Sequence, residues 1–410
     1  MIGSLINEDM KVEGFLHAED PLSTMLALNQ IGSVIESVDG KFINIKKRKI
    51  LFLEPEKALD LGNSGTGLRL MLGMTAGLGL KLDFIGDSSL SKRPMERVID
   101  PLTQMGAHIS SLDGMLPIGL RSSALKDNFI YELPIASAQV KSCILLAGLA
   151  SRNSVTVIEP VQTRDHTERM LKNFGANIQT IKQDGKNIIH LEGQALLRAR
   201  DYKVAGDISS AAFLIVGALI SQSKKLEILN VGMNPTRTGI LSVLEDMGAK
   251  IEILNSRIES GEPIADLVVH QSQLRGINLE GPIIANIIDE LPIISIAAAF
   301  AIGNTTIRDA VELRIKESDR LKAISDGFKI LGVKHDNFDD GMKIYGNSEL
   351  KSNSDPIIIN SQHDHRIAMS FLIAALKSSQ PIQVNQCKNI FTSFPNFIEL
   401  TSSLGFKIEK

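Results

Sequence analysis

A dense run of charged residues lies at Leu313–Leu321, which reads Leu-Arg-Ile-Lys-Glu-Ser-Asp-Arg-Leu. If a helix begins near Ser318, then Arg320 lies in its first turn, where unpaired N–H groups already favour an anion. Arg adds a forked donor that suits a carboxylate or phosphate, and Lys316 adds a point charge. The neighbouring Glu317 would weaken a simple anion trap, so it indicates proton transfer as well as binding. A solvated helix start with local ion pairs is the alternative.

Polar residues also open several apolar stretches that have helical spacing. These openings are Gly62-Asn-Ser-Gly-Thr-Gly, Lys92-Arg-Pro, Ser137-Ala-Gln, Thr163-Arg-Asp-His, Asp289-Glu and Asp364-His-Arg. Simple caps, tight turns or solvated loops would account for some of them, and Pro94 suits the first position of a helix. Together they carry cations at Arg93, Arg164 and Arg366. Added to the cations of the first run, these imply a positive site for a substrate with more than one phosphate or carboxylate.

Two acids could move protons at such a site. One is Glu317, and the other is Asp289, which stands beside Glu290 just before an apolar helix. Either member of that pair could instead cap the helix. His365 has no partners with metal-ligand spacing, and the chain has neither a P-loop nor a dinucleotide-binding fingerprint. We expect Cys143, which lies in an apolar helix, to be a buried and unreactive thiol.

Length and composition limit the class of protein. With 410 residues, 43% hydrophobic and 22% charged, the chain has the composition of a globular protein of about two domains. A net charge of −3 argues against a general nucleic-acid binder, so any anion site must be local. The two cysteines form no disulfide framework, and the longest apolar run, Leu291–Ile302, is too short to span a membrane. We therefore expect a cytoplasmic protein.

The chain repeats one unit six times. In each copy a helical pattern ends at a glycine, and a strand follows; these glycines are Gly32, Gly106, Gly175, Gly248, Gly332 and Gly405. A glycine in this place indicates a helix C-cap in the left-handed region. A second, almost wholly apolar helix in each copy should be buried on most sides. We therefore expect an α/β protein with two domains of three repeats, residues 1–205 and 206–410, with buried helices and outer sheets.

The first copy differs at its start. Residues 3–12 align with the tail of the apolar helix around Ala147–Val155, and its polar opening and preceding strand have no counterpart. We expect that the natural protein begins upstream and that Met1 is an internal methionine. A shortened terminal repeat is the alternative.

Taken together, these motifs resemble the 5-enolpyruvylshikimate-3-phosphate (EPSP) synthases, or 3-phosphoshikimate 1-carboxyvinyltransferases. The resemblance covers essentially the whole chain. It is carried by Gly62-Asn-Ser-Gly-Thr, Lys92-Arg-Pro-Met, Ser137-Ala-Gln-Val-Lys-Ser, Thr163-Arg-Asp-His-Thr-Glu, Arg314-Ile-Lys-Glu-Ser-Asp-Arg-Leu and Asp364-His-Arg-Ile-Ala-Met. The Ser-Ala-Gln and Thr-Arg-Asp-His forms are similar to the bacterial group that includes glyphosate-tolerant members.

The resemblance implies a two-domain inside-out α/β barrel, or prism, in which each domain has three βαβαββ-type repeats and the active site lies in the cleft between the domains. It implies transfer of the enolpyruvyl group of phosphoenolpyruvate to the 5-hydroxyl of shikimate 3-phosphate, on the route to chorismate and the aromatic amino acids. The hydroxyl attacks a protonated enol carbon, and the tetrahedral intermediate then loses phosphate. No metal or organic cofactor, nucleic acid or membrane partner is implied, and we expect a monomer.

The resemblance also assigns roles to residues of this chain. Phosphoenolpyruvate would be held by Gly65, Arg93, Gln139, Arg320 and Arg366. Shikimate 3-phosphate would be held by Ser137, Ala138 through its backbone, Gln139, Arg164, Asp289 and Lys316. Asp289 would accept the proton of the 5-hydroxyl, and Glu317 would move protons at the enol carbon.

The chain departs from the family pattern in two places. The family has a Lys-Ser pair and an Arg at the opening of its first apolar helix, the part with no counterpart here. We therefore expect severely impaired turnover of the chain as printed, and restored turnover once the upstream codons are added; equal turnover by both lengths would refute the idea. Thr392-Ser-Phe-Pro stands where some relatives carry a Lys before Phe-Pro, so that phosphoenolpyruvate contact is not carried over. Tolerant members can have Ala at the position of Gly65, and we infer no herbicide tolerance.

Two other functions are considered. A related transferase acts on UDP-N-acetylglucosamine and has a reactive Cys near the Lys92-Arg-Pro region, where this chain has none. The other is a non-catalytic remnant that binds phosphorylated ligands. Titration with shikimate 3-phosphate separates the cases, because a synthase must also release phosphate.

Overall fold

The computed structural model describes residues 1–40, 42–222, 224–346, 350 and 355–409. These residues fold into a mixed α/β structure with several small mixed sheets. The chain divides into two compact units; the first holds Met1–Val204 with Glu259–Glu262, and the second holds Ala205–Ile258 and Pro263–Lys410. No helix in the described part of the chain is both long and apolar enough to cross a membrane.

The strands of the first unit form four-stranded sheets in the orders β12-β1-β3-β2, β4-β5-β7-β6 and β8-β9-β11-β10. Their bounds are β1 (Met10–Glu13), β2 (Val34–Val38), β3 (Phe42–Lys46), β4 (Leu59–Asp60), β5 (Leu82–Ile85), β6 (His108–Leu112), β7 (Met115–Arg121), β8 (Phe129–Glu132), β9 (Val155–Glu159), β10 (Ile178–Gln183), β11 (Lys186–Leu191) and β12 (Tyr202–Lys203). In each of these sheets the first two strands are parallel: β12 with β1, β4 with β5 and β8 with β9. Parallel neighbours need a crossover connection, which a single apolar helix supplies between β4 and β5 and between β8 and β9.

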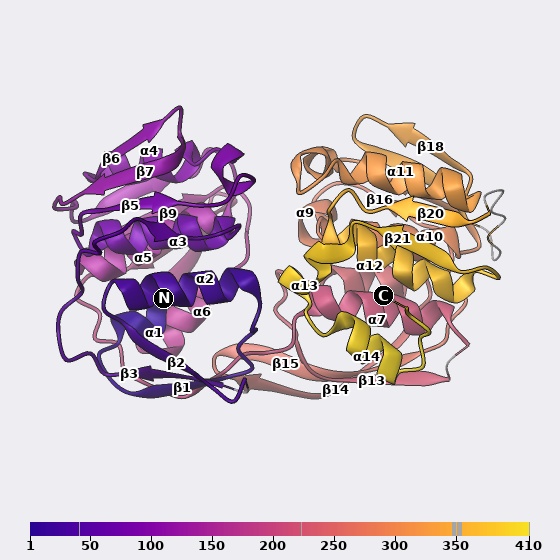
Figure 1. Cartoon of the computed structure of the whole chain (residues 1–410), viewed down its shortest axis with the longest axis horizontal. Helices are drawn as coiled ribbons and strands as arrows, with labels where there is room; N and C mark the ends of the chain where they lie inside the picture. Colours follow the sequence, from indigo (N-terminus) through magenta and orange to yellow (C-terminus); the bar gives the residue numbers. More distant parts are fainter. Residues whose placement is uncertain (41, 223, 347–349, 351–354, 410) are drawn as a thin grey trace. The chain divides into compact units, whose positions relative to one another are not determined.

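The crossover helices are the centre of this unit. Its helices are α1 (Ile2–Leu5), α2 (Glu19–Gln30), α3 (Gly65–Gly77), α4 (Glu96–Met105), α5 (Ala138–Ser151) and α6 (His166–Asn173). Figure 1 shows α3 and α5 inside the unit, with strands β5–β7 on one side and β1–β3 on the other. A Cβ on Gly73 would lie 2.2 Å from the carbonyl oxygen of Cys143, so only glycine allows this close approach of α3 to α5. Cys143 is buried, and burial raises the pKa of its thiol to about 12, which confirms the expected unreactive thiol.

The strands of the second unit form the sheets β13-β15-β14, β16-β17-β19-β18 and β20-β21. Their bounds are β13 (Lys225–Gly232), β14 (Lys250–Glu259), β15 (Glu262–His270), β16 (Asn278–Leu279), β17 (Gly303–Ile307), β18 (His335–Phe338), β19 (Gly341–Gly346), β20 (Ile357–Asn360) and β21 (Ile382–Asn385). Here too the strands that flank an apolar helix are parallel, β16 with β17 and β20 with β21.

The helices of the second unit are α7 (Ile208–Ile220), α8 (Gly239–Asp246), α9 (Ile283–Ile287), α10 (Leu291–Ala299), α11 (Arg320–Leu331), α12 (His365–Ala374), α13 (Ile390–Ser393) and α14 (Phe397–Ser403). Every residue of α10 is buried, and so is nearly every residue of α7. Figure 1 shows α7 and α12 in the interior of this unit, with β13–β15 along one side. This burial confirms the prediction for the apolar helices. They have no polar face that would have to lie in solvent.

The glycine turns that end the helices of the repeat have the predicted conformation. All six glycines have positive φ, from 72° at Gly332 to 112° at Gly106. The N–H of the residue after each glycine reaches back to the last turn, as when Ala107 N donates to Leu102 O at 2.9 Å and Val333 N to Phe328 O at 2.9 Å. This pattern satisfies carbonyl groups that a helix end leaves unpaired.

Most predicted helix starts are also confirmed. The N-cap residues are Ser64 for α3, Ser137 for α5, Asp165 for α6, Asp207 for α7, Glu290 for α10, Asp319 for α11 and Asp364 for α12. The placement of Pro94 at the first helical position is wrong, because α4 begins at Glu96. A 3-10 turn at Leu90–Lys92 comes first, and Arg93 is extended, as expected for a residue before proline.

Candidate active site

The start of α11 places one buried guanidinium among three carboxylates. Arg320 is only 1% exposed, and its Nε donates to Asp364 Oδ2 at 2.8 Å. Its Nη2 donates to Glu317 Oε2 at 2.6 Å, and its Nη1 lies 3.5 Å from Asp289 Oδ1. Within the described residues Nη1 makes no hydrogen bond. One buried donor of the Arg320 guanidinium therefore faces the Asp289 carboxylate with hydrogen-bonding capacity to spare.

Asp289 lies between two cations. Lys316 Nζ is 3.8 Å from Asp289 Oδ1, on the same oxygen that Arg320 approaches. The Asp289 side chain is 16% exposed and that of Lys316 is 29% exposed, so both remain accessible to a ligand. Glu317 is 40% exposed, more than either. The run Leu313–Leu321 is therefore not a solvated helix start with local pairs, because its side chains reach Asp289 and Asp364 from distant parts of the sequence.

The start of α12 contributes a second arginine to the same cluster. Arg366 Nη1 donates to the backbone oxygen of Asp289 at 2.9 Å and lies 3.5 Å from Glu290 Oε1. Burial alone would lower the pKa of Arg366, but the nearby Asp289 and Glu290 carboxylates raise it above its ordinary value. The backbone bond to Asp289 ties the two predicted residues directly to each other.

Glu290 is the buried acid beside Asp289, with 2% of its side chain exposed. Burial raises the pKa of the Glu290 carboxyl, while Arg366 acts in the opposite direction. Ser209 Oγ donates a short hydrogen bond to Glu290 Oε1 and in turn accepts from Arg237 Nη2 at 2.8 Å. Arg237 also bonds to Asp207 Oδ1 at 2.6 Å, so the start of α7 joins this network.

The residues that open α12 differ in charge state. Burial alone would raise the pKa of Asp364, but Arg320 brings it below its ordinary value. Burial, together with the charge of Arg366, lowers the pKa of His365 to about 4. At neutral pH the cluster therefore combines an ionised Asp364 with a neutral His365. The predicted acids Asp289 and Glu317 lie among the predicted cations of this unit, and the buried carboxylates of Asp364 and Glu290 pair with the same arginines.

In the first unit, Gly65 lies against Arg93. A Cβ on Gly65 would lie 3.1 Å from Arg93 Nη1, which shows how closely the guanidinium approaches the backbone at the start of α3. Arg93 Nη2 donates to Asn63 Oδ1 at 2.8 Å, and Asn63 Nδ2 donates to Asp87 Oδ2 at 2.7 Å. The extended residue before Pro94 is thus held over a helix N-terminus, where backbone N–H groups favour an anion.

Gln139 is joined to this arrangement through Arg69 and Thr66. Arg69 Nη1 donates to Gln139 Oε1 at 2.7 Å, and Gln139 Nε2 donates to Thr66 Oγ1 at 2.7 Å. Burial, together with the charges of Arg97 and Arg93, lowers the pKa of Arg69 to about 10. The structure therefore brings Gly65, Arg93 and Gln139 together as predicted.

Ser137, Ala138 and Arg164 lie at the starts of α5 and α6. Ser137 Oγ accepts from Val140 N at 3.5 Å, so Ser137 is the N-cap and Ala138 the first helical residue. Arg164 directly precedes Asp165, the N-cap of α6. The two helix starts are linked where Ser142 Oγ lies 2.7 Å from Thr167 Oγ1.

Sequence reasoning missed several members of these networks. Arg69 follows Gly65 by one helical turn, and that spacing is the signal that could have placed both on one face of α3. Ser209 stands in the first turn of α7, and the polar sequence Asp207-Ile-Ser-Ser before an apolar helix is the signal that could have found it. Arg237 had no signal, because its partners are about 30 residues away and only the fold joins them.

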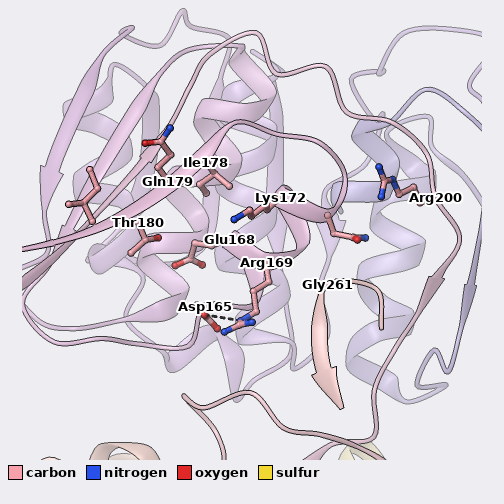
Figure 2. Close-up of a pocket in the computed structure, with 11 residues that line it drawn as sticks. Asp165, Glu168, Arg169, Lys172, Ile178, Gln179, Thr180, Arg200 and Gly261 are labelled. Atoms are coloured by element: carbon pink, nitrogen blue, oxygen red, sulfur yellow. Dashed lines mark hydrogen bonds and ion pairs between the residues drawn. The ribbon is translucent and has the colours of Figure 1, made fainter. Parts of the chain in front are cut away.

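Two further features of the described residues bear on the site. They contain no group of three or more His, Cys, Asp or Glu side chains arranged for a metal ion. A groove of about 830 Å³ in the first unit lies between α6 and β10, where Arg169 pairs with Asp165 (Figure 2). None of the predicted binding or catalytic residues lines that groove, although its lining residue Asp165 directly follows Arg164.

Comparison with known proteins gives a consistent result. Residues 1–400 match the family model described as EPSP synthase (3-phosphoshikimate 1-carboxyvinyltransferase). The 3-phosphoshikimate 1-carboxyvinyltransferase of Ruthia magnifica is 44% identical over 414 residues, which cover 100% of this chain and 92% of that protein. The one from Methylococcus capsulatus is 45% identical over 411 residues, with the same coverage. The solved structure of EPSP synthase from Acinetobacter baumannii has a TM-score of 0.89 at 42% identity and covers 99% of this chain and 92% of that chain.

Proposed function

The chain belongs to the family of EPSP synthase, the 3-phosphoshikimate 1-carboxyvinyltransferase of aromatic amino acid biosynthesis, and from this premise we propose how its own residues perform the transfer. The resemblance drawn from the motifs is confirmed. The proposed reaction joins the enolpyruvyl group of phosphoenolpyruvate to the 5-hydroxyl of shikimate 3-phosphate and releases phosphate.

The observation that carries the proposal is the cluster around Asp289. A base must lie within reach of a substrate hydroxyl, and Asp289 is partly exposed and flanked by Arg320 Nη1 at 3.5 Å and Lys316 Nζ at 3.8 Å. Such flanking cations suit a substrate that carries phosphate and carboxylate groups. An acid able to exchange protons, Glu317, lies on the same guanidinium.

The proposed steps balance in protons and bonds. Glu317 gives a proton to the methylene carbon of phosphoenolpyruvate while Asp289 removes the proton of the 5-hydroxyl, and the new C–O bond forms at the enol carbon. The tetrahedral intermediate then loses phosphate by cleavage of its C–O bond, and the departing phosphate takes up the proton that Asp289 removed from the 5-hydroxyl. A proton returns from the methyl group to Glu317, which restores the double bond.

The cations hold the two substrates. Arg320 and Arg366 in the second unit, and Arg93 in the first, would bind the carboxylate and phosphate of phosphoenolpyruvate. Gly65 leaves room beside Arg93, because a side chain there would meet the guanidinium at 3.1 Å. Gln139, which is hydrogen-bonded to Arg69 and Thr66, completes this part.

Shikimate 3-phosphate would take the remaining positions. The first N–H groups of α5, at Ala138 and Gln139, are oriented for a phosphate in the way that helix N-termini favour, with the Ser137 hydroxyl beside them. Arg164 adds a cation before α6, while Lys316 and Asp289 bind from the second unit. The neutralised phosphate and the hydroxyl held near Asp289 define the orientation of the ring.

This assignment carries a proposal about the whole fold. We propose that the two units are the domains 1–205 and 206–410 of an inside-out α/β barrel, each with three βαβαββ-type repeats, and that the substrates bind in the cleft between them. The buried apolar helices within each unit support the barrel. We also propose that the protein acts as a monomer, which sedimentation can test.

The experiment is an end-point assay of the full chain with phosphoenolpyruvate and shikimate 3-phosphate. We expect phosphate release that requires both substrates, together with a product whose mass equals shikimate 3-phosphate plus the enolpyruvyl group. The criterion is this dependence, not the rate. UDP-N-acetylglucosamine in place of shikimate 3-phosphate is the control. Phosphate release from phosphoenolpyruvate with UDP-N-acetylglucosamine but not with shikimate 3-phosphate would refute the proposal. Binding of phosphoenolpyruvate and shikimate 3-phosphate without phosphate release would refute it as well.

A further inference from the structure

A buried ion triad lies beneath the starts of α5 and α6. Lys141 Nζ is 3.1 Å from Glu159 Oε2 and 2.7 Å from Glu168 Oε1. The side chains of Lys141, Glu159 and Glu168 are 0%, 2% and 9% exposed. They come from α5, the end of β9 and the first turn of α6, so the triad joins three elements of the first unit.

Packing alone does not account for this triad. Burying an ammonium and two carboxylates removes their hydration, and apolar side chains of the same volume usually serve stability as well or better. The neighbouring residues of α5, such as Cys143 and Ile144, are apolar and fully buried. Because Lys141 is a single charged side chain among apolar ones, we take its role to be fixing the positions of the elements it joins.

Glu159, the ion-pair partner of Lys141, is connected to the loop before α6 through hydrogen bonds. Thr163 Oγ1 donates to Glu159 Oε2 at 2.7 Å, and Thr163 N donates to Glu159 Oε1 at 3.3 Å. The same Oε2 is the atom nearest Lys141. Thr163 directly precedes Arg164, so the position of Arg164 along the loop depends on a carboxylate that Lys141 holds.

Lys141 is equally close to the start of α5. Its backbone N donates to Ser137 O at 3.1 Å, and Lys141 is two residues after Gln139. The next residue, Ser142, contacts Thr167 of α6 through a 2.7 Å hydrogen bond. One turn of α5 therefore carries both the proposed substrate contacts and the attachments to α6.

We infer that Lys141, through Glu159 and Thr163, is a positioning residue that fixes the Ser137–Gln139 helix start relative to Arg164 and so sets the spacing of the shikimate-phosphate contacts. The inference rests on the proposed function, because it concerns the residues assigned there to shikimate 3-phosphate. Neither Lys141 nor Glu159 has to touch the substrate for this role.

Thr163→Val is the most selective test, because it removes the hydroxyl that binds Glu159 and leaves the triad intact. Lys141→Met removes the ammonium, and Lys172→Met is the matched control on the exposed surface of α6. For each full-length variant, the Kd for shikimate 3-phosphate is measured by calorimetry, with the melting temperature and the KM for phosphoenolpyruvate as further readouts.

We expect Thr163→Val and Lys141→Met each to raise the Kd and KM for shikimate 3-phosphate about tenfold, in line with the loss of a charge-assisted contact. The KM for phosphoenolpyruvate should stay within about twofold, and the double variant should be no weaker than the weaker single one. Lys172→Met should have the same Kd for shikimate 3-phosphate and the same KM values as the parent. If Lys141→Met does not fold, Thr163→Val decides.

The outcomes separate the two ideas. A parent chain that binds no shikimate 3-phosphate contradicts the proposed function. A parent that binds it, together with a folded Thr163→Val chain of unchanged affinity, overturns the positioning role of Lys141. Equal rises in the KM values for both substrates would also overturn it, because a general structural defect would then explain the weaker binding.

Discussion

Arg320 donates through Nε to Asp364 Oδ2 at 2.8 Å, and neither side chain is more than 1% exposed. Asp364 is also the N-cap of α12, where it accepts from the backbone N of Arg366 at 2.8 Å. One buried carboxylate therefore fixes the first turns of two helices, α11 and α12. The arginines that project from those turns both approach Asp289.

Replacing Arg320 should test this buried pair. Arg320→Met leaves Asp364 buried without its cation, and we expect the free energy of unfolding to fall by about 3–5 kcal/mol. Lys322→Met, on the exposed side of the same helix, breaks a solvent-screened ion pair with Asp326 and should leave the free energy of unfolding nearly unchanged. Urea denaturation followed by circular dichroism measures both. Equal losses in the free energy of unfolding of the two variants would show that the buried Arg320–Asp364 pair stabilises the fold no more than an exposed pair does.

The contact between Gly65 and Arg93 gives a second prediction. In Gly65→Ala the new Cβ would lie 3.1 Å from Arg93 Nη1, so the guanidinium must move by a few tenths of an ångström. We expect the fold to persist and the KM for phosphoenolpyruvate to rise about threefold to tenfold, equivalent to about 1 kcal/mol.

Gly67→Ala is the control within the same helical turn. Its Cβ would lie 2.5 Å from Ser64 Oγ and 2.6 Å from Thr24 Oγ1, which disturbs the N-cap of α3. Here we expect a loss of stability of about 1 kcal/mol instead of a selective rise in KM. A Gly65→Ala chain with unchanged affinity for phosphoenolpyruvate would count against the placement of Arg93.

His365 should make stability depend on pH. Its pKa is about 4 in the folded protein and about 6.5 in an unfolded chain, so the folded state favours the neutral ring. Between these values the unfolded chain binds the extra proton, and stability falls as the pH is lowered. At pH 5 this contribution is about 2 kcal/mol relative to pH 7.5.

The variant His365→Gln isolates this contribution from other titrating groups. Urea unfolding at pH 7.5 and pH 5 should show the parent losing about 2 kcal/mol more than the variant. If parent and variant lose stability in parallel, the ring of His365 is not kept neutral by the fold.

Glu290 should act with the opposite sign. Burial raises the pKa of its carboxyl, so its charged form destabilises the folded state as the pH rises through that pKa. Glu290→Gln keeps the acceptor for Ser209 Oγ and removes the charge. We expect the variant to be at least as stable as the parent at pH 8, with the difference vanishing near pH 4.5, as thermal denaturation at the two values would show. A variant less stable at pH 8 would show that Arg366 needs the Glu290 charge.

The sequence allowed much of the local structure to be predicted, because single residues determine it. Gly106 and Gly332 lie at left-handed helix ends, and Ser137 and Asp364 cap helices, as their types indicate. The failure at Pro94 has a local cause as well, since Arg93 had to be extended and the helix could start only later.

Pairings between distant residues could not be predicted in this way. Lys141 meets Glu159 and Glu168 only because α5, β9 and α6 pack together, and Ser209 meets Glu290 only because the starts of α7 and α10 lie side by side. The sequence indicated the cations near helix starts and the acids Asp289 and Glu317, but not that Arg320 would be buried among the carboxylates of Asp289, Glu317 and Asp364.

The most direct test of the account compares the parent chain with Asp289→Asn in the two-substrate assay. The substitution keeps the size of the side chain but removes the base, and we predict that phosphate release falls by about 10²–10⁴ while shikimate 3-phosphate still binds. Mass spectrometry of the product confirms that the parent forms the enolpyruvyl ether. Equal release by the two proteins would contradict the proposed role of Asp289 and, with it, the central claim.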